Sequence, residues 1–318
     1  MTNYITEERN ERVKPSFRQM KIALVKWTYK VLYKINPRYA ADLMYYQAFH
    51  KRMNLDTPQT LVEKINWMQF NADTSLWTLC ADKYRMREYV AEKGLEDHLP
   101  KLYGHWESPD EIVFDALPSE FVLKSNNGCG TVKIVWDKSQ LDISATRKLL
   151  RSWLKPYGYV GGQTHYLRIK PCIVAEELLH QDEAEKVFSP TSLVDYKMWC
   201  INGEPESIWV AFNRHNALMV NMALFDREWN PMPQHLRDTN LETYDPNAII
   251  PRPVCLDEMF EIAKRISEPF PELRLDFYVI GGKPYIGEMT LTSGYGFYTD
   301  EYYNYLGSKM DISKVARK

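Results

Sequence analysis

The spacing of apolar residues divides the chain into a helical first part and a strand-rich remainder. Residues 17–35, FRQMKIALVKWTYKVLYKI, have the spacing of a basic amphipathic helix, and residues 59–71 and 81–93 also predict helices. From Phe121 onward short β-branched and apolar runs predict strands, and the pattern returns to a helix at 256–268.

Tight turns join two pairs of the predicted strands. Asn202-Gly203 separates a strand within 192–201 from one at 205–212, and residues 281–283 separate 274–280 from 284–290. Strands that pair through hairpins, with helices between them, predict an α+β protein built on mainly antiparallel sheets.

Composition excludes several classes of protein. The 318 residues carry a formal net charge of −2, so no global positive field points to nucleic acid. No apolar run approaches the ~18 residues that a membrane span needs, and the first residues lack the apolar core of a secretory signal. The five cysteines are scattered and form no C-x-x-C pair, which fits a reducing compartment and predicts a cytoplasmic protein. The sequence has neither H-E-x-x-H nor G-x-S-x-G, so a zinc hydrolase or a serine esterase has no support.

The first candidate site lies in FVLKSNNGCG, residues 121–130. Lys124 ends an apolar strand and is followed by two asparagines and two glycines. Glycine lets a backbone approach a phosphate closely, and a lysine adds a positive point charge. Neither a P-loop nor a dinucleotide fingerprint fits, because no G-K-[ST] follows and the next element is a strand. A phosphate cradle and an ordinary hairpin turn with a surface lysine both remain open.

The second candidate site lies on the last predicted hairpin. If its loop has three residues, Asp276 lies opposite Glu288 and Arg274 lies opposite Thr290 on one face, whereas a two-residue turn would separate the two acids. Adjacent carboxylates repel unless a cation lies between them, and oxygen ligands suit Mg²⁺. The alternative is a solvent-facing strand pair with incidental acids.

The third candidate site is IVAEELL, residues 173–179. Its backbone and leucines could receive an adenine while a carboxylate binds a ribose hydroxyl. Alone, the pattern equally describes a buried strand with an exposed end.

Together, these segments resemble the ATP-grasp superfamily, which includes D-alanine–D-alanine ligase and glutathione synthetase. The order is a helix beginning at Asp82-Lys83, then VLK with a glycine-rich loop, then V-x-E-E-x-L, then R-x-D and E-x-T. The closest likeness is to the branch linked to teichuronopeptide and capsular polysaccharide biosynthesis, often labelled glycosyltransferase. The matching segments span roughly residues 50–310 and are EKINWMQF, ADKYRMREYV, LPSEFVLKSNNGCG, IKPCIVAEELL, DYKMWCINGEP and LDFYVIGGKPYIGEMTLTSGYGF.

The resemblance implies a role for each matched position. The ATP contacts it implies are Lys83, Lys124, Asn127, Gly128, Gly130, Glu176, Glu177 and Leu179. It places Mg²⁺ at Asp276 and Glu288; Thr290 is a weaker ligand, because many members have asparagine there. It places Lys197 and Arg214 near the γ-phosphate, Arg274 at the acyl-phosphate, and residues 292–297 in the acceptor pocket.

The resemblance also implies an activity and a division into parts. The activity is ATP-dependent ligation of a carboxylate, such as a uronic acid of a surface polysaccharide or its precursor, to an amino acid or small amine. The parts are a helical region at 1–80, a small ATP-grasp subdomain at 81–190 and a large one with the metal site at 191–318. Three alternatives stay open: a glycosyltransferase, a sugar kinase, and a nucleotide-binding accessory protein. The sequence lacks the D-x-D metal site that is typical of glycosyltransferases, so a glycosyltransferase would have to be of the metal-free kind.

Residues 17–35 allow two further interpretations. Their lysines and aromatic residues suit an anionic membrane surface, which would place the protein at the inner membrane. Alternatively, the helix packs on the domain and its basic side faces water.

Overall fold

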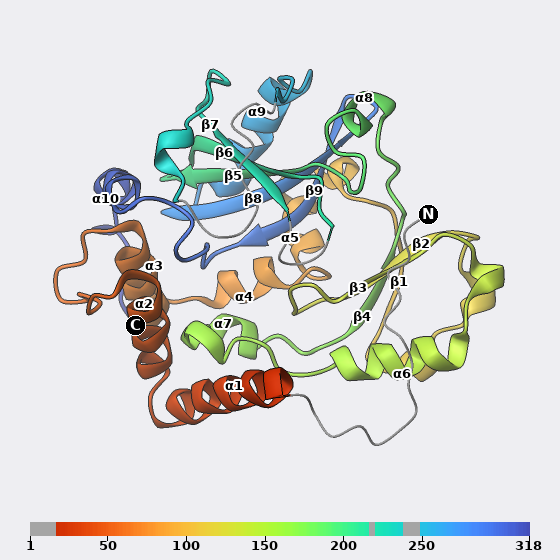
Figure 1. Ribbon diagram of the computed structural model, residues 1–318, viewed down its shortest axis with the longest axis horizontal. Helices are drawn as coiled ribbons and strands as arrows, with labels where there is room; N and C mark the ends of the chain where they lie inside the picture. Colours follow the sequence, from red (N-terminus) through yellow and green to blue (C-terminus); the bar gives the residue numbers. More distant parts are fainter. Residues whose placement is uncertain (1–16, 216–219, 238–248) are drawn as a thin grey trace.

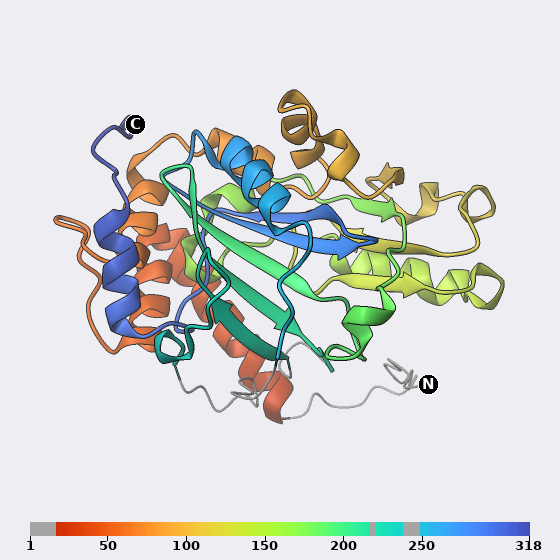
Figure 2. The same ribbon diagram turned by 90° about the horizontal axis from the view of Figure 1, so that it is seen from above.

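The computed structural model describes residues 17–215, 220–237 and 249–318 (Figures 1 and 2). In these residues, helices from the first part of the chain pack beside two antiparallel sheets, which confirms the predicted α+β class. The longer helices are α1 (Phe17–Ile35), α2 (Pro37–Phe49), α3 (Leu61–Asn71), α4 (Ser75–Ala81), α5 (Met86–Glu92), α6 (Ile143–Trp153), α9 (Leu256–Ser267) and α10 (Asp300–Lys309). The single-turn helices that matter below are η5 (Val160–Gly162), α7 (Thr164–Leu167) and α8 (Glu183–Lys186).

The first helices begin where the sequence supplies capping groups. Asn36 caps α2, and its side chain accepts a bond from the backbone N–H of Arg38 while Pro37 takes the first helical position. Thr60 and Glu63 form a reciprocal capping box at the start of α3.

The helix predicted at 81–93 is wrong in its first turn. Helix α4 ends at Ala81, and α5 begins only at Met86. Between them, the Asp82 carboxylate accepts bonds from the backbone N–H groups of Tyr84 and Arg85 at 2.9 and 3.2 Å. A side chain that binds its own backbone in this way competes with helix formation.

A four-stranded sheet carries the glycine-rich loop, and its strand order is β1-β4-β2-β3. Its strands are β1 (Leu102–Trp106), β2 (Phe121–Ser125), β3 (Val132–Val135) and β4 (Ile173–Glu176). Strand β4 is shorter than the predicted 173–179 and ends at Glu176. The next residue, Glu177, donates its backbone N–H to the carbonyl of Lys101, just before β1.

A five-stranded sheet carries the acidic hairpin, and its strand order is β7-β6-β5-β8-β9. Its strands are β5 (Asp195–Ile201), β6 (Glu204–Phe212), β7 (Asn221–Phe225), β8 (Glu272–Ile280) and β9 (Lys283–Thr290). Both predicted hairpins, β5–β6 and β8–β9, are present.

The turn of the last hairpin differs from the predicted three-residue loop. Ile280 pairs with Lys283, so the turn has two residues, yet Asp276 still lies opposite Glu288. The ladder shifts by one residue between Asp276 and Phe277, where Gly287 forms a β-bulge. The extra residue of the bulge puts Asp276 and Glu288 back on the same face of the sheet, which the two-residue turn alone would not do.

Two hydrophobic clusters form the core of the described residues. The larger joins the five-stranded sheet to α2–α5, α9 and α10, and the smaller lies between the four-stranded sheet and α6. The predicted helical region thus shares its core with the large sheet, while the boundaries at 80 and 190 stay predictions.

Candidate active site

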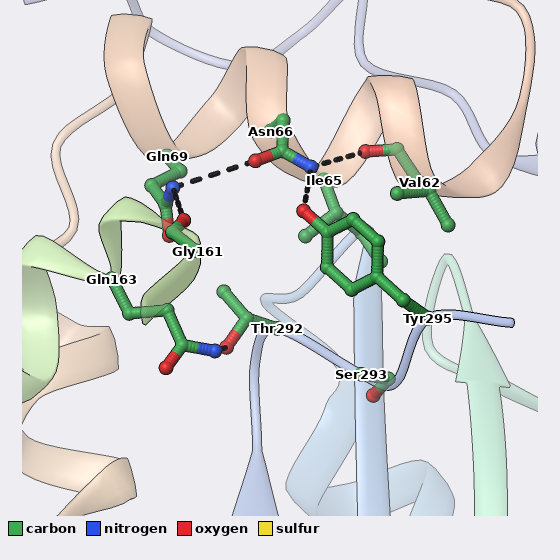
Figure 3. A pocket seen from close by; sticks show the side chains of 9 residues that line it. All are labelled: Val62, Ile65, Asn66, Gln69, Gly161, Gln163, Thr292, Ser293 and Tyr295. Carbon is green, nitrogen blue, oxygen red and sulfur yellow. Dashed lines mark hydrogen bonds between the residues drawn. The ribbon is translucent and has the colours of Figure 1, made fainter. Parts of the chain in front are cut away.

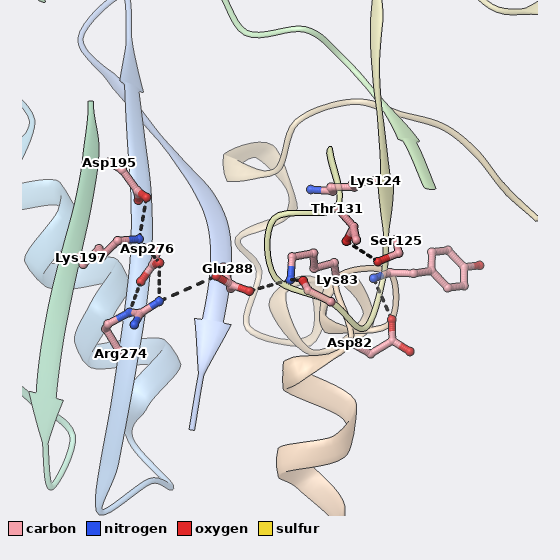
Figure 4. Close-up of polar contacts among 12 residues, drawn as sticks. Asp82, Lys83, Lys124, Ser125, Thr131, Asp195, Lys197, Arg274, Asp276 and Glu288 are labelled. Carbon is pink, nitrogen blue, oxygen red and sulfur yellow. Dashed lines mark hydrogen bonds and ion pairs between the residues drawn. The ribbon is translucent and has the colours of Figure 1, made fainter. Parts of the chain in front are cut away.

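Three neighbouring strands of the large sheet bring charged side chains onto one face. Lys197 on β5 lies opposite Asp276 on β8, and Asp276 lies opposite Glu288 on β9. Two residues further along the strands, on the same face, Arg274 pairs with Thr290. This row of side chains, with Asp195 beside it, is called here the charged row (Figure 4).

Asp276 is the centre of the charged row. Its buried carboxylate accepts bonds from Lys197 Nζ at 2.5 Å and from Arg274 Nε and Nη2 at 2.6 and 2.7 Å. Lys197 also contacts Asp195 at 2.5 Å. Burial alone would lower the pKa of Lys197, but Asp195 and Asp276 outweigh it and raise the pKa. The lysine therefore stays charged at every physiological pH.

Glu288 joins the charged row to the rest of the site. Its carboxylate binds Lys83 Nζ at 2.6 Å and lies 3.8 Å from Arg274 Nη2. Burial would raise the pKa of Glu288, but these two cations overcome that effect and lower it to about 2. Glu288 is thus ionised and is already paired with Lys83.

Lys83 spans the space between the two sheets. Its Nζ donates to the Gly128 carbonyl at 2.9 Å as well as to Glu288, so it ties the glycine-rich loop to the large sheet. The loop is also closed within itself, because the hydroxyls of Ser125 and Thr131 lie 2.6 Å apart (Figure 4). Gly130, just before Thr131, has a φ of +72°, a backbone conformation that favours glycine.

Lys124 points to a second buried carboxylate. Its Nζ forms an ion pair with Glu176 on β4, and Arg87 lies 3.3 Å from the other oxygen of the same carboxylate. Glu177 follows β4 and accepts a bond from the Lys101 N–H at 3.2 Å, and half-buried Leu179 lies two residues further. These residues therefore lie on and just beyond β4 of the small sheet, and the predicted adenosine contact of Glu176, Glu177 and Leu179 stays a prediction.

Two predicted site residues lie apart from this cluster of charges. The buried Asn127 side chain donates to the Lys155 carbonyl at 3.0 Å, so it anchors the base of the loop. Arg214 follows β6, where its N–H donates to the Ser192 hydroxyl at 2.9 Å. Its charge lowers the pKa of Tyr278, against the larger raising effects of Asp195 and burial.

The donor set fits Mg²⁺ in chemistry and number. Asp276 and Glu288 supply two facing carboxylates, and the buried Thr290 hydroxyl has no hydrogen-bond partner. Two or three protein oxygens suit Mg²⁺, which completes its shell with phosphate and water. In the described part of the chain, no group of three or more His, Cys, Asp or Glu side chains could hold a metal alone.

The residues just beyond the end of β9 line a small pocket, and the sequence predicted only some of its lining residues (Figure 3). Residues 292–297 were predicted to line an acceptor pocket, and Thr292, Ser293 and Tyr295 do line this one. Its other walls come from α3 and η5 and were not predicted; they are Val62, Ile65, Asn66, Gln69, Gly161 and Gln163. Only EKINWMQF, within which Asn66 and Gln69 lie, gave a signal for them.

The pocket is lined by neutral hydrogen-bonding groups. The Asn66 amide donates to the Tyr295 hydroxyl at 2.7 Å, and the Gln163 amide donates to the Thr292 hydroxyl at 2.9 Å (Figure 3). One buried atom at its wall, Gln69 Oε1, accepts no hydrogen bond, and a hydroxyl or amide group of a ligand would satisfy it. The Ser293 hydroxyl lies beside the Glu272 carboxyl: burial raises the pKa of that carboxyl, and the hydroxyl opposes the rise.

Comparison with protein families decides the identity of the fold. A family model described as TupA-like ATPgrasp matches residues 63–311. The chain belongs to this family. The match confirms the predicted superfamily and its branch.

Ligases are among the solved structures that this TupA-like ATP-grasp chain resembles. D-alanine–D-alanine ligase from Bacillus anthracis with ATP has 12% identity and a TM-score of 0.44, over 74% of this chain and 64% of that one. L-amino acid ligase from Bacillus licheniformis has 15% identity and a TM-score of 0.42, over 70% of this chain and 44% of that one. TM-scores below 0.5 and partial coverage transfer neither substrates nor residue roles to the TupA-like chain. Among curated proteins, no sequence matches it.

Proposed function

We propose that the protein is an ATP-dependent carboxylate–amine ligase that works through an acyl-phosphate. The observation that carries this proposal is the charged row with Lys83, in which three cations surround two facing carboxylates beside a glycine-rich loop. Membership of the TupA-like ATP-grasp family supports the same chemistry.

Each half-reaction requires charge stabilisation more than proton transfer. First, an acceptor carboxylate oxygen attacks the γ-phosphorus of ATP, the bond to the β-phosphate oxygen breaks, and ADP leaves. Then an uncharged amine attacks the acyl carbon, the bond between that carbon and the bridging phosphate oxygen breaks, and inorganic phosphate and a proton leave. Lys83 and Lys124 can hold the phosphates, while Lys197 and Arg274 can balance charge on the transferred phosphoryl group.

Mg²⁺ would be held by Asp276 and Glu288, with Thr290 in support. When bound, the ion neutralises charge on the phosphate oxygens. For Glu288 to bind it through the oxygen that Lys83 Nζ contacts at 2.6 Å, the lysine would have to leave that oxygen. Lys83 would then be free to bind phosphate, so the same movement prepares both partners.

The acceptor that we propose is a hydroxyl-rich carboxylate, such as a uronic acid of a surface polysaccharide or its precursor. The neutral pocket begins two residues beyond Thr290, with Thr292, and its polar walls offer amide and hydroxyl groups instead of charges. Its volume of about 10 Å³ has room for about one water molecule, so it would have to widen to admit a sugar ring. Tyr166, on α7 three residues beyond Gln163 of the pocket wall, lies close to the charged row. Burial raises the pKa of Tyr166, Glu288 raises it further, and Arg274 opposes them, so both charges lie near its ring. The amine would be an amino acid or small amine.

A hydroxylamine trap tests the ligase against a kinase or a glycosyltransferase. The protein is incubated with ATP, Mg²⁺, hydroxylamine and either glucuronic acid or the matched neutral sugar, methyl glucoside. We expect a hydroxamate and ADP only with the acid, because hydroxylamine captures acyl-phosphates. ADP formation with methyl glucoside would indicate a kinase, and no carboxylate-dependent ADP over a panel of sugar acids would refute the ligase.

Variants locate that reaction. Arg274→Lys and Lys197→Gln should each lower turnover by about a hundredfold or more. The first removes the paired N–H donors of the guanidinium from the transferred phosphoryl group, and the second removes a positive charge from it. Lys264→Gln, on α9, is the control and should leave turnover unchanged. Full activity in both site variants would contradict the assigned roles.

A further inference from the structure

Helix α1 has two apolar faces, and only one of them packs on the protein. On the packed side, Tyr29 is buried and its hydroxyl donates to Gln47 at 2.7 Å. Further along, the Tyr33 hydroxyl donates to Thr164 at 3.3 Å, and its ring meets Tyr159 edge-on. These contacts join the second half of α1 to α2 and to the segment around η5.

The opposite face is an exposed apolar stripe, which consists of Met20, Leu24, Trp27, Val31 and Ile35. These positions are spaced by three or four residues and so line one side of the helix. The side chains of Met20, Leu24, Trp27 and Ile35 are 57–68% exposed, and Val31 is half-buried. Monomeric proteins rarely leave a continuous apolar stripe in water without a use for it.

A row of lysines runs beside the stripe. Lys26, Lys30 and Lys34 are exposed and lie one turn apart, and α1 contains no acidic residue. Of these three lysines, Lys30 lies 5.5 Å from the Tyr159 ring centre. The helix itself therefore presents apolar and positive groups together and carries no acidic side chain.

We propose that α1 docks in the plane of an anionic membrane surface. Apolar residues on one side of a helix and lysines along its edge are what such a surface selects, with about 1 kcal/mol from each lysine near anionic lipid. A second copy of the chain fits less well, because pairing two stripes would bring lysine rows together with no acidic residue on α1 to oppose them. Docking in the interface does not require a membrane span, and none of the described helices is long and apolar enough to be one.

Vesicle sedimentation of the full chain tests this proposal. We expect binding to phosphatidylcholine vesicles that contain phosphatidylglycerol, and weaker binding to phosphatidylcholine alone. The double variant Leu24→Gln/Trp27→Gln should lower the partition coefficient at least tenfold on the anionic vesicles. Lys26→Gln/Lys34→Gln should lower it about fivefold per lysine on anionic vesicles and leave the phosphatidylcholine value unchanged.

A matched control and the oligomeric state complete the experiment. Val187→Gln/Lys264→Gln replaces an exposed valine and a lysine away from α1, and it should bind vesicles as the original protein does. Equal binding of the stripe variant, or no binding by the original protein, would overturn the proposal. So would a dimer in sedimentation velocity that Leu24→Gln/Trp27→Gln converts to a monomer, because a second copy would then cover the stripe. Neither measurement needs nucleotide or acceptor, so both are independent of ligase activity.

Discussion

Glu288 shows how single residues of the site are tuned by their neighbours. Its folded-state pKa of about 2 lies below the ordinary value of 4.5, because Lys83 and Arg274 outweigh burial. A depressed carboxylate pKa contributes stability that is present above about pH 4.5 and is lost as the pH falls toward 2.

We therefore predict a pH-dependent difference between the original protein and Glu288→Gln. The difference in free energy of unfolding should be constant above about pH 5 and change by on the order of 1–3 kcal/mol as the pH falls toward 2, because glutamine does not titrate. Urea denaturation at a series of pH values measures it. A difference that does not vary with pH would show that Lys83 and Glu288 are not paired in solution.

Glu272 has the opposite character, although it lies on the same strand two residues from Arg274. It is buried, neither carboxylate oxygen has a well-formed hydrogen bond, and burial raises its pKa to about 7. A raised carboxyl pKa means that stability present below about pH 4.5 is lost as the pH rises through 7.

Glu272→Gln should therefore be more stable than the original protein at pH 8, by on the order of 1–3 kcal/mol, and nearly equal to it at pH 4.5. Chemical denaturation at the two pH values provides the comparison. Glu268→Gln, which changes an exposed glutamate on the solvent side, should show no such dependence. Equal stability of Glu272→Gln and the original protein at pH 8 would mean that the carboxyl is not buried.

Among the elements, the β8–β9 hairpin shows both what the sequence can predict and what it cannot. Alternation along 274–280 predicted that Arg274 and Asp276 share a face, and the structure agrees. The register was right for a wrong reason: a two-residue turn and a bulge at Gly287 replace the predicted three-residue loop. The alternation of apolar and polar residues cannot locate a bulge. One residue added within a strand and one residue added to the turn both move the side chains beyond them to the other face of the sheet.

The bulge should be sensitive to any side chain at Gly287. A Cβ there would lie 2.8 Å from the Tyr278 ring, so Gly287→Ala should destabilise the protein by about 1–3 kcal/mol and lower ATP turnover by moving Glu288. Gly281→Asn is the control on the same hairpin, since its φ of +59° suits asparagine and a Cβ meets nothing. Thermal unfolding and ATPase assays compare them. Unchanged turnover in a folded Gly287→Ala would show that the bulge does not position Glu288.

At the scale of the whole molecule, the site depends on contacts that no local pattern contains. Lys83 reaches from the turn after α4 to Glu288, 205 residues later, and Asn66 on α3 reaches Tyr295. Sequence reasoning assigned Lys83 and Glu288 separately, through a family resemblance, and it did not foresee that they pair. It found the elements because periodicity is local, whereas the packing of α3 and η5 around the pocket is set by the tertiary core.

Because Lys83 joins two separately packed cores, nucleotide should change the link between them. We predict that ATP with Mg²⁺ slows amide exchange and proteolysis at 125–131 by roughly tenfold or more, because bound phosphates add contacts to the loop beyond the one that Lys83 Nζ makes with Gly128. ATP without Mg²⁺ and the variant Asp276→Asn serve as controls and should show weaker protection. Equal rates in every condition would mean that the loop does not cover the nucleotide.

The packing of α1 on the η5 segment has a consequence for the supply of acceptor. Tyr33 contacts Thr164, one residue beyond Gln163, whose side chain helps to form the neutral pocket. If the stripe of α1 lies on a bilayer, the pocket wall at Gln163 lies on the other side of the helix, about one helix diameter (~10 Å) from the lipid surface. An acceptor carried on a lipid would then be found by diffusion in two dimensions, at a high effective concentration even when few copies exist. Weak intrinsic affinity for the free sugar acid would be sufficient for such an enzyme.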